Sequence, residues 1–199
     1  SFGGVVNVIT KSGSNEFNGS LFGTFRNQRM RASNFSEVMN DAEKADSQRS
    51  AYGFSAGGAI VKEKLFYFVS AEKQDEATPS TLNSLLTDYA GTEPPGYPFQ
   101  IAEPGTSVNR SLNRKLLSVR LDYHATPNHL LWFRYAYDNA GFANDQGGTL
   151  TDPSNDGSSQ NRTWSAIANW QWVVSSRMIN ELKVHTNDFV NRIASSSPD

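Results

Sequence analysis

Apolar and polar residues alternate with a period of two along most of the chain, which is typical of β-strands whose two faces have different surroundings. The clearest run is LLSVRLDYH at 116–124, and the run at 130–138 repeats it after the short segment TPNH. Pro and Asn favour a tight turn in that segment, so the two runs predict a β-hairpin. The residues expected on its apolar face are Leu117, Val119, Leu121, Tyr123, Leu131, Phe133, Tyr135 and Tyr137.

The same alternation predicts seven strands, joined by connections of two lengths. The strands are expected at about 16–27, 50–61, 65–74, 116–124, 130–138, 162–174 and 178–188. Short turns are expected at 61–64, 126–129 and 174–177, and long polar loops near 28–49, 75–113 and 139–161. Short and long connections therefore lie at opposite ends of the strands, as in outer-membrane barrels. This predicts an all-β fold, an antiparallel up-and-down transmembrane β-barrel fragment with about seven strands in an open curved sheet and long extracellular loops.

Tryptophan placement supports a membrane-spanning sheet. Trp164 and Trp172 lie on one face of the sixth strand, about 26 Å apart at roughly 3.3 Å per residue, which is about 20 Å of height at a tilt of roughly 40°. That is close to the apolar band of about 25 Å between aromatic girdles. The lipid-facing residues are expected to be Leu117, Val119, Leu121, Tyr123, Leu131, Phe133, Tyr135, Trp164, Trp170 and Trp172. A soluble β-sandwich with these residues in its core is the alternative, because alternation does not distinguish a core from lipid.

The opposite face of the strands carries mixed charges. An Arg or Lys that faced lipid at the membrane midplane would cost about 2–4 kcal/mol, so these residues are expected to line the lumen. The set is Arg26, Glu72, Arg120, Asp122, Arg134, Asp138, Glu181 and Lys183. In the alternative, they form the solvated face of a soluble sheet.

Composition narrows the function classes. The net charge of −2 and the absence of any Lys/Arg run longer than two give no reason to expect nucleic acid as a partner. The chain has no cysteine, which excludes disulfides and thiolate sites. No stretch approaches the roughly 20 apolar residues of a membrane helix.

Candidate catalytic and metal chemistry is sparse. Asp152, Ser154 and Asp156 in DPSNDG are a weak calcium candidate, because Thr163 stands where such a loop supplies its bidentate Glu. The three histidines lie on separate predicted elements, and no nucleophile elbow is present. The acidic residues Glu72, Asp75 and Glu76 are expected at a strand end, on a solvated rim. We therefore expect no enzyme, no resident metal and no cofactor.

The opening stretch GGVVNVITKSGSNEFNGS at 3–20 resembles the junction between the plug domain and the first barrel strand of TonB-dependent outer-membrane receptors, most strongly the Oar-like branch. The similarity continues, in order, through YGFSAGGAIVKEKLFYFVSAE at 52–72, RKLLSVRLDYHATPNHLLWFRYAY at 114–137 and INELKV at 179–184. It covers nearly every predicted strand and is lost in the long loops. The junction residues that carry it are Gly3, Gly4, Thr10, Lys11, Ser12, Gly13 and Asn15.

This resemblance implies a domain division and a function. Residues 1–15 would be the end of the plug domain and its linker, and residues 16–199 the N-terminal part of the barrel. Because the chain opens within the motif, we expect a fragment of a longer protein. The implied activity is energised transport of an unidentified ligand across the bacterial outer membrane, with outer-membrane lipid and, through the missing N-terminal part, the TonB complex as partners. A soluble secreted β-sandwich for adhesion or carbohydrate binding remains the second hypothesis, and an enzyme the third.

Overall fold

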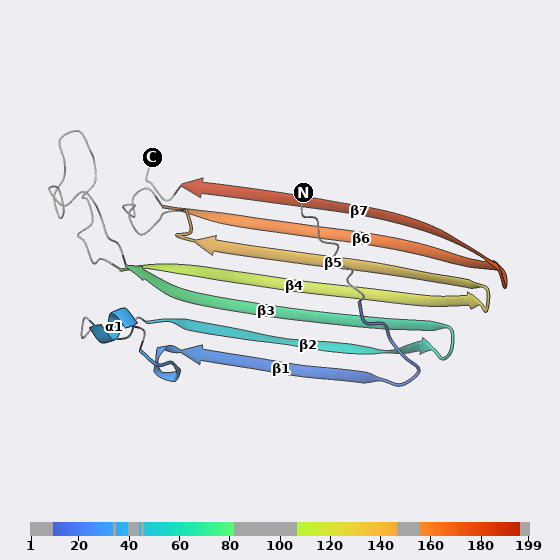
Figure 1. The fold of residues 1–199 in the computed structure, drawn as a ribbon, viewed down its shortest axis with the longest axis horizontal. Helices are drawn as coiled ribbons and strands as arrows, with labels where there is room; N and C mark the ends of the chain where they lie inside the picture. Colours follow the sequence, from blue (N-terminus) through green and yellow to red (C-terminus); the bar gives the residue numbers. More distant parts are fainter. Residues whose placement is uncertain are drawn as a thin grey trace.

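The protein forms a single antiparallel sheet of seven strands, each paired with its neighbours in sequence (Figure 1). The computed structural model describes residues 10–33, 35–39, 44, 46–81, 107–146 and 156–195. The strands are β1 (Asn18–Asn27), β2 (Gln48–Val61), β3 (Leu65–Thr81), β4 (Ser107–Thr126), β5 (His129–Ala143), β6 (Gly157–Ser175) and β7 (Met178–Ser195). A 3-10 turn, η1 (Gln28–Met30), and a short helix, α1 (Phe35–Met39), lie between β1 and β2.

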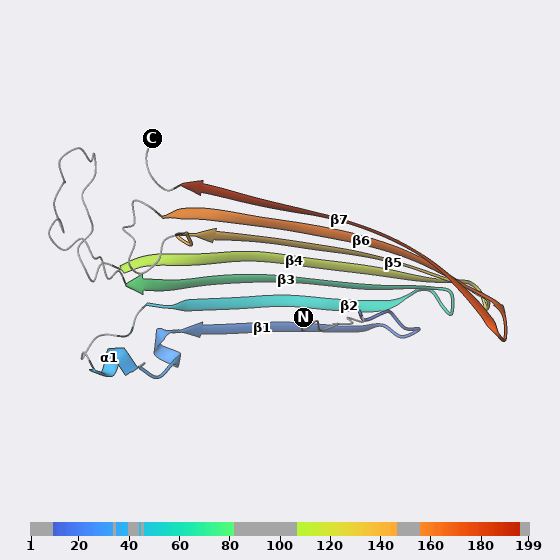
Figure 2. The ribbon, with the colours of Figure 1, turned by 45° about the horizontal axis from the view of Figure 1, so that its top comes forward.

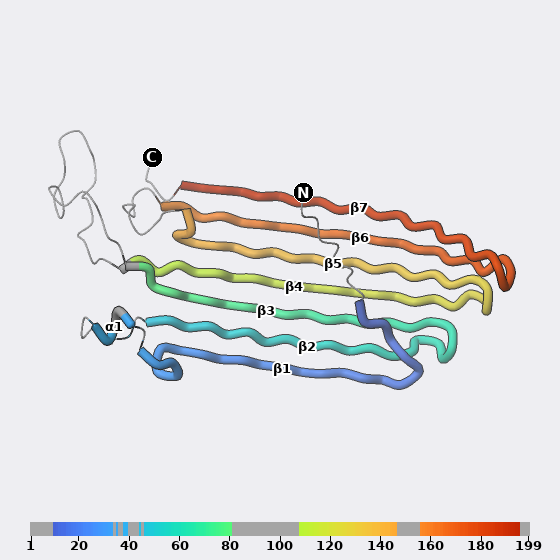
Figure 3. The backbone as a smooth tube through the Cα atoms, in the orientation of Figure 1, coloured from blue at the N-terminus to red at the C-terminus, as the bar shows by residue number. Residues whose placement is uncertain are grey.

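The connections lie as the alternation predicts. The turns β2–β3, β4–β5 and β6–β7 are short and gather at one end of the sheet, and the other connections leave from the opposite end (Figure 3). In the first short turn, Glu63 takes a left-handed backbone with φ of 63°, and the Lys64 amide donates to the Val61 carbonyl at 3.1 Å. The predicted up-and-down order of seven strands is thus confirmed.

No second layer covers either face of this sheet (Figure 2). The accessible surface is 13968 Å², against about 9,300 Å² expected for a compact monomer of 22.0 kDa. Among the described apolar residues only Phe66 and Ala140 are buried, whereas Leu21 is 88% exposed. The described residues therefore form the open sheet predicted for a barrel fragment and not the alternative sandwich, which needs a second sheet to bury the apolar side chains.

The strands are longer than predicted on the side of the long connections. β3 continues to Thr81 and β4 begins at Ser107, so that Pro79, expected in a loop, pairs with Asn109. Glu72, Asp75 and Glu76 consequently lie inside β3, and their expected position at a strand end is wrong. The pairing beyond residue 74 is stabilised by backbone hydrogen bonds and does not require the alternation from which the strand end was inferred.

The register gives the sheet two chemically distinct faces. On one, the apolar face, Leu121 lies opposite both Tyr67 and Phe133, which in turn lies opposite Ala168. All ten residues predicted to face lipid lie on this face, because the odd positions of β4 and β5 are aligned with the even positions of β6. The eight charged residues predicted to face the lumen all lie on the other, the polar face. Which surroundings each face has in the cell stays a prediction.

No helix in the described part of the chain is long and apolar enough to cross a membrane.

Candidate functional site: the polar face and the segment docked on it

The segment that precedes β1 crosses the polar face near the short turns (Figure 3). Thr10 is held from β4, because Arg120 Nη1 donates to the Thr10 carbonyl at 3.1 Å and to its hydroxyl at 2.9 Å. Five residues later, Asn15 Oδ1 accepts a hydrogen bond of 2.8 Å from the Glu63 amide in the β2–β3 turn. By Phe17 the chain has reached the apolar face, where it covers Gly58. The segment 10–15 is therefore attached to the sheet at both ends.

Gly13 allows this segment to lie directly on the sheet backbone. A Cβ at Gly13 would lie 2.3 Å from the Tyr67 carbonyl oxygen and 2.6 Å from that of Gly58. Both distances are far below van der Waals contact with backbone atoms that cannot move aside. Any other residue at position 13 would lift the segment off β2 and β3.

Arg120 is the centre of the contact between the segment and the wall. Its Nη2 donates to Asp122 Oδ1 at 2.7 Å, its Nε donates to the same carboxylate at 2.9 Å, and its guanidinium lies 5.1 Å from the centroid of the Trp132 ring. The Arg120 and Asp122 side chains are only 16% and 12% exposed. Because Asp122 and Trp132 hold the guanidinium in place, Nη1 is left free to bind Thr10. This is a preorganised, charge-assisted contact.

A second arginine lies beside this network without completing it. Arg134 on β5 is directly opposite Arg120, and its buried Nε has no hydrogen-bond partner among the described residues. Like charges that face each other across two strands are destabilising, and an unsatisfied buried donor adds to that cost. The polar face at this position therefore favours an additional acceptor or anion.

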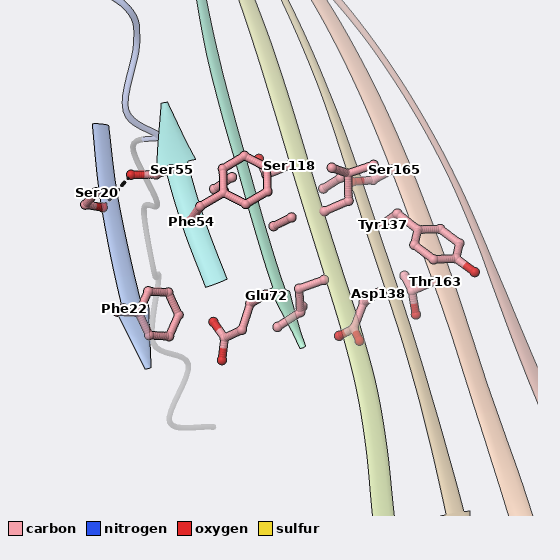
Figure 4. A pocket seen from close by; sticks show the side chains of 15 residues that line it. Ser20, Phe22, Phe54, Ser55, Glu72, Ser118, Tyr137, Asp138, Thr163 and Ser165 are labelled. Carbon is pink, nitrogen blue, oxygen red and sulfur yellow. Dashed lines mark hydrogen bonds between the residues drawn. The ribbon is translucent and has the colours of Figure 1, made fainter. Parts of the chain in front are cut away.

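Further along the polar face, small side chains form a row across six strands. The row, which we call the serine row, consists of Ser20, Ser55, Ser70, Ser118, Ala136 and Ser165. It forms the floor of a hollow of about 520 Å³, with Phe22, Glu72 and Asp138 on the side toward the long connections (Figure 4). The Ser20 and Ser55 hydroxyls are hydrogen-bonded at 2.8 Å. Small side chains let another piece of polypeptide approach the wall closely and offer it hydroxyl partners.

Several of the remaining charges of the polar face are paired in half-exposed positions. Arg114 Nε donates to Asp138 Oδ1 at 3.0 Å, and Lys183 Nζ lies 3.3 Å from Glu181 Oε1. Asn169 also donates to Glu181. Of the predicted lumen set, Arg120 and Asp122 are brought together, as are Glu181 and Lys183, whereas Asp138 pairs with Arg114, a residue outside that set.

Aromatic side chains gather at two heights on the apolar face. Near the short turns, His129 stacks on both Trp170 and Trp172 with centroid distances of 5.8 and 5.7 Å, and Trp170 Nε1 donates to His129 Nδ1 at 3.1 Å. Nearer the long connections, Tyr135 stacks on Trp164 at 6.4 Å. Between them lie aliphatic and aromatic residues such as Leu121.

The calcium candidate has a structural role at its one described residue. Asp156 Oδ1 accepts hydrogen bonds from the amides of Gln146 and Gly157 at 3.0 and 2.8 Å, which closes the entry into β6. Asp152 and Ser154 lie outside the described residues, as do Gly3 and Gly4 of the predicted junction. No group of three or more His, Asp or Glu side chains in the described ranges is placed to hold a metal ion.

Two features of the site were not found from the sequence. The link from Arg120 to Thr10 joins residues 110 positions apart, and nothing in either local pattern indicates it. The serine row was hidden because each serine is an ordinary polar position on its own strand. Aligning the small residues of consecutive strands through the predicted hairpins would have revealed it.

An open sheet with one apolar face, one polar face and aromatic residues at two heights is a section of the wall of a transmembrane β-barrel. A family model described as "Outer membrane beta barrel domain" matches residues 9–92 and 96–199. The chain belongs to this family and resides in the bacterial outer membrane.

Part of the chain is also similar to a curated transporter. The chain is 37% identical over 98 residues to the TonB-dependent transporter Oar of Myxococcus xanthus. That match covers 46% of this chain and 9% of the relative, so the chain corresponds to a small part of it. No solved structure matches the chain. The Oar-like resemblance inferred from the sequence is confirmed.

Proposed function

We propose that this chain forms the end of the plug domain and the first seven barrel strands of a TonB-dependent transporter. In this proposal residues 1–15 belong to the plug and its linker, and residues 16–199 to the barrel. The polar face is the lumen wall and the apolar face contacts lipid. The protein takes up a ligand across the outer membrane without chemical conversion, and the inner-membrane TonB complex supplies the energy.

The observation that carries this proposal is the attachment of Thr10 to Arg120 on the polar face. It places Thr10 on the polar face, which in this proposal is the side of the sheet that the barrel encloses. Hydrogen bonds from a charged donor contribute about 1.5–3 kcal/mol, so Arg120 can hold the end of the plug on the wall at rest and release it when force is applied to the plug. The serine row and the unsatisfied Arg134 offer the rest of the plug a close-fitting, hydrogen-bonding surface.

Energised movement of the plug can be tested without knowing the ligand. The chain has no cysteine, so Lys11→Cys introduces a single thiol into it, at an exposed position beside the Arg120 contact. In the full-length protein in its native host, we expect a membrane-impermeant maleimide to label this thiol several-fold faster in energised cells than after a protonophore or deletion of TonB.

Thr24→Cys, on the polar face of β1 but away from the docked segment, is the matched control and should react at one rate under all conditions. Equal rates for Lys11→Cys with and without TonB would contradict energised movement at this junction. A rise in the labelling rate of both variants in energised cells would indicate a general change of permeability and would count equally against the proposal.

The orientation of the barrel is tested separately by epitope tags. Because the long connections are proposed to be extracellular, tags inserted near Gly96 and Gly148 should bind antibody on intact cells. A tag at Asn128, in a short turn, should bind only after the outer membrane is permeabilised. Antibody binding at Asn128 on intact cells, with none at Gly96, would show that the sheet is inverted.

A further inference from the structure

Basic residues line the apolar face immediately beyond its aromatic upper edge. Lys73 on β3 and Lys115 on β4 are directly opposite each other, and Arg162 on β6 follows after one intervening strand, opposite Asn139. We call these three residues the basic row. Moving toward the short turns, the next position on each strand of this face is Ala71, Leu117 or Trp164, so the basic row borders the apolar band directly.

The protein balances the charges of this row only in part. Lys73 Nζ lies 2.9 Å from Asp75 and 6.0 Å from the centroid of the Tyr52 ring. Lys115 and Arg162 are exposed and have no ion pair within the described residues. Asp188, on β7 opposite Trp164, is the other nearby carboxylate on this face and lies at the sheet edge. Like charges directly opposite each other destabilise a sheet, so the Lys73–Lys115 pair favours a bound anion.

The height of the row identifies the anion. Trp172 and Trp164 lie eight residues apart, which gives an apolar band about 20 Å tall on a strand tilted by roughly 40°. The basic row lies one residue pair beyond Trp164, about 5 Å higher at the same tilt. Side chains at that level meet lipid headgroups, where Trp and Tyr mark the interface and Lys and Arg attract anionic lipids.

We propose that Lys73, Lys115 and Arg162 form a binding site for the phosphate groups of a phosphorylated glycolipid of the outer leaflet. This inference rests on the proposed orientation, which puts the long connections outside the cell. The two lysines act as adjacent point charges. The backbone of Arg162 lies about 10 Å from that of Lys115, across two strand spacings, and its guanidinium holds a second phosphate group. The acyl chains of the same lipid lie along the apolar face below, against Leu117 and Tyr137.

Native mass spectrometry of the full-length protein in detergent, titrated with diphosphorylated lipid A, tests the site. The test variant is Lys73→Gln/Lys115→Gln/Arg162→Gln. Its matched control, Lys62→Gln/Lys64→Gln/Arg177→Gln, removes the same charge from exposed side chains in the short turns. At about 1 kcal/mol per basic residue near an anionic lipid surface, the test variant should bind about 100-fold more weakly, and the control should bind as the unchanged protein does.

Three outcomes would overturn the proposal: equal affinity in the test variant and the unchanged protein, equal affinity of the unchanged protein for dephosphorylated lipid A, or full competition by inorganic phosphate. Lys73→Arg/Lys115→Arg keeps the charge and should retain binding. The change in its gel mobility on boiling verifies that this variant is folded. Because binding in detergent depends neither on TonB nor on orientation, its loss is distinguishable from failure of the labelling and tag experiments.

Discussion

Arg120→Ala is expected to destabilise the full-length protein by about 3–5 kcal/mol, because it leaves Asp122 buried without its partner. The midpoint of urea unfolding in detergent measures the loss. The same variant should raise the rate at which Lys11→Cys is labelled in de-energised cells, since the segment loses its two hydrogen bonds at Thr10.

Two variants separate the effect of burial from that of charge. Arg114→Ala removes an arginine from an ion pair whose side chains are 40% and 32% exposed, and it should cost about 0–1 kcal/mol. The double variant Arg120→Met/Asp122→Leu removes both buried charges and should recover most of the stability lost in Arg120→Ala. A similar loss of stability in Arg114→Ala and Arg120→Ala would show that the burial of the Arg120 network does not increase its contribution to stability.

Leu121→Arg is expected to destabilise the protein by about 2–4 kcal/mol, because Leu121 lies midway between the two aromatic levels of the apolar face, where a charge would face lipid. Leu116→Arg, on the same strand but on the polar face, is the control. Leu116 lies opposite both Glu72 and Asp138, which can neutralise an introduced arginine. The control should therefore lose much less stability than Leu121→Arg.

Refolding into lipid vesicles measures both variants under the same conditions, through the fraction that reaches the heat-modifiable form. If Leu116→Arg is the more damaging of the two, the assignment of lipid and lumen to the two faces is reversed. If both refold as the unchanged protein does, neither face contacts lipid at this height.

The fold could be predicted from the sequence where apolar and polar residues alternate strictly. In β4 from Leu117 to Tyr123, every residue on the polar face is small or polar and every residue on the apolar face is apolar or aromatic, so a period of two is visible. Nearer the long connections the pattern reverses: Leu112 and Phe142 lie opposite each other on the polar face, and Asn113 lies on the other face beside Asp75. A reversed pattern has no single apolar side, and the predicted strands therefore ended too early.

The contacts of the docked segment could be predicted only in part. The resemblance around Gly13 predicts a junction between plug and barrel there, and that division of the chain stays a prediction. The hydrogen bond from Arg120 to Thr10 could not be predicted, because the charge pattern of β4 places Arg120 on a face but does not indicate which segment packs against that face. Partners brought together by long-range docking leave no trace in local periodicity.

The length of the strands has a consequence for the shape of the intact receptor. β4 has 20 residues, which is about 66 Å of strand and about 50 Å of height at a tilt of roughly 40°. An apolar band of about 25 Å accounts for half of this. The reversed pattern beyond the basic row is what water on the outside requires. In the orientation proposed above, the barrel would rise above the membrane surface as a walled vestibule about 25 Å deep, and a solute would travel down it before it reached the plug.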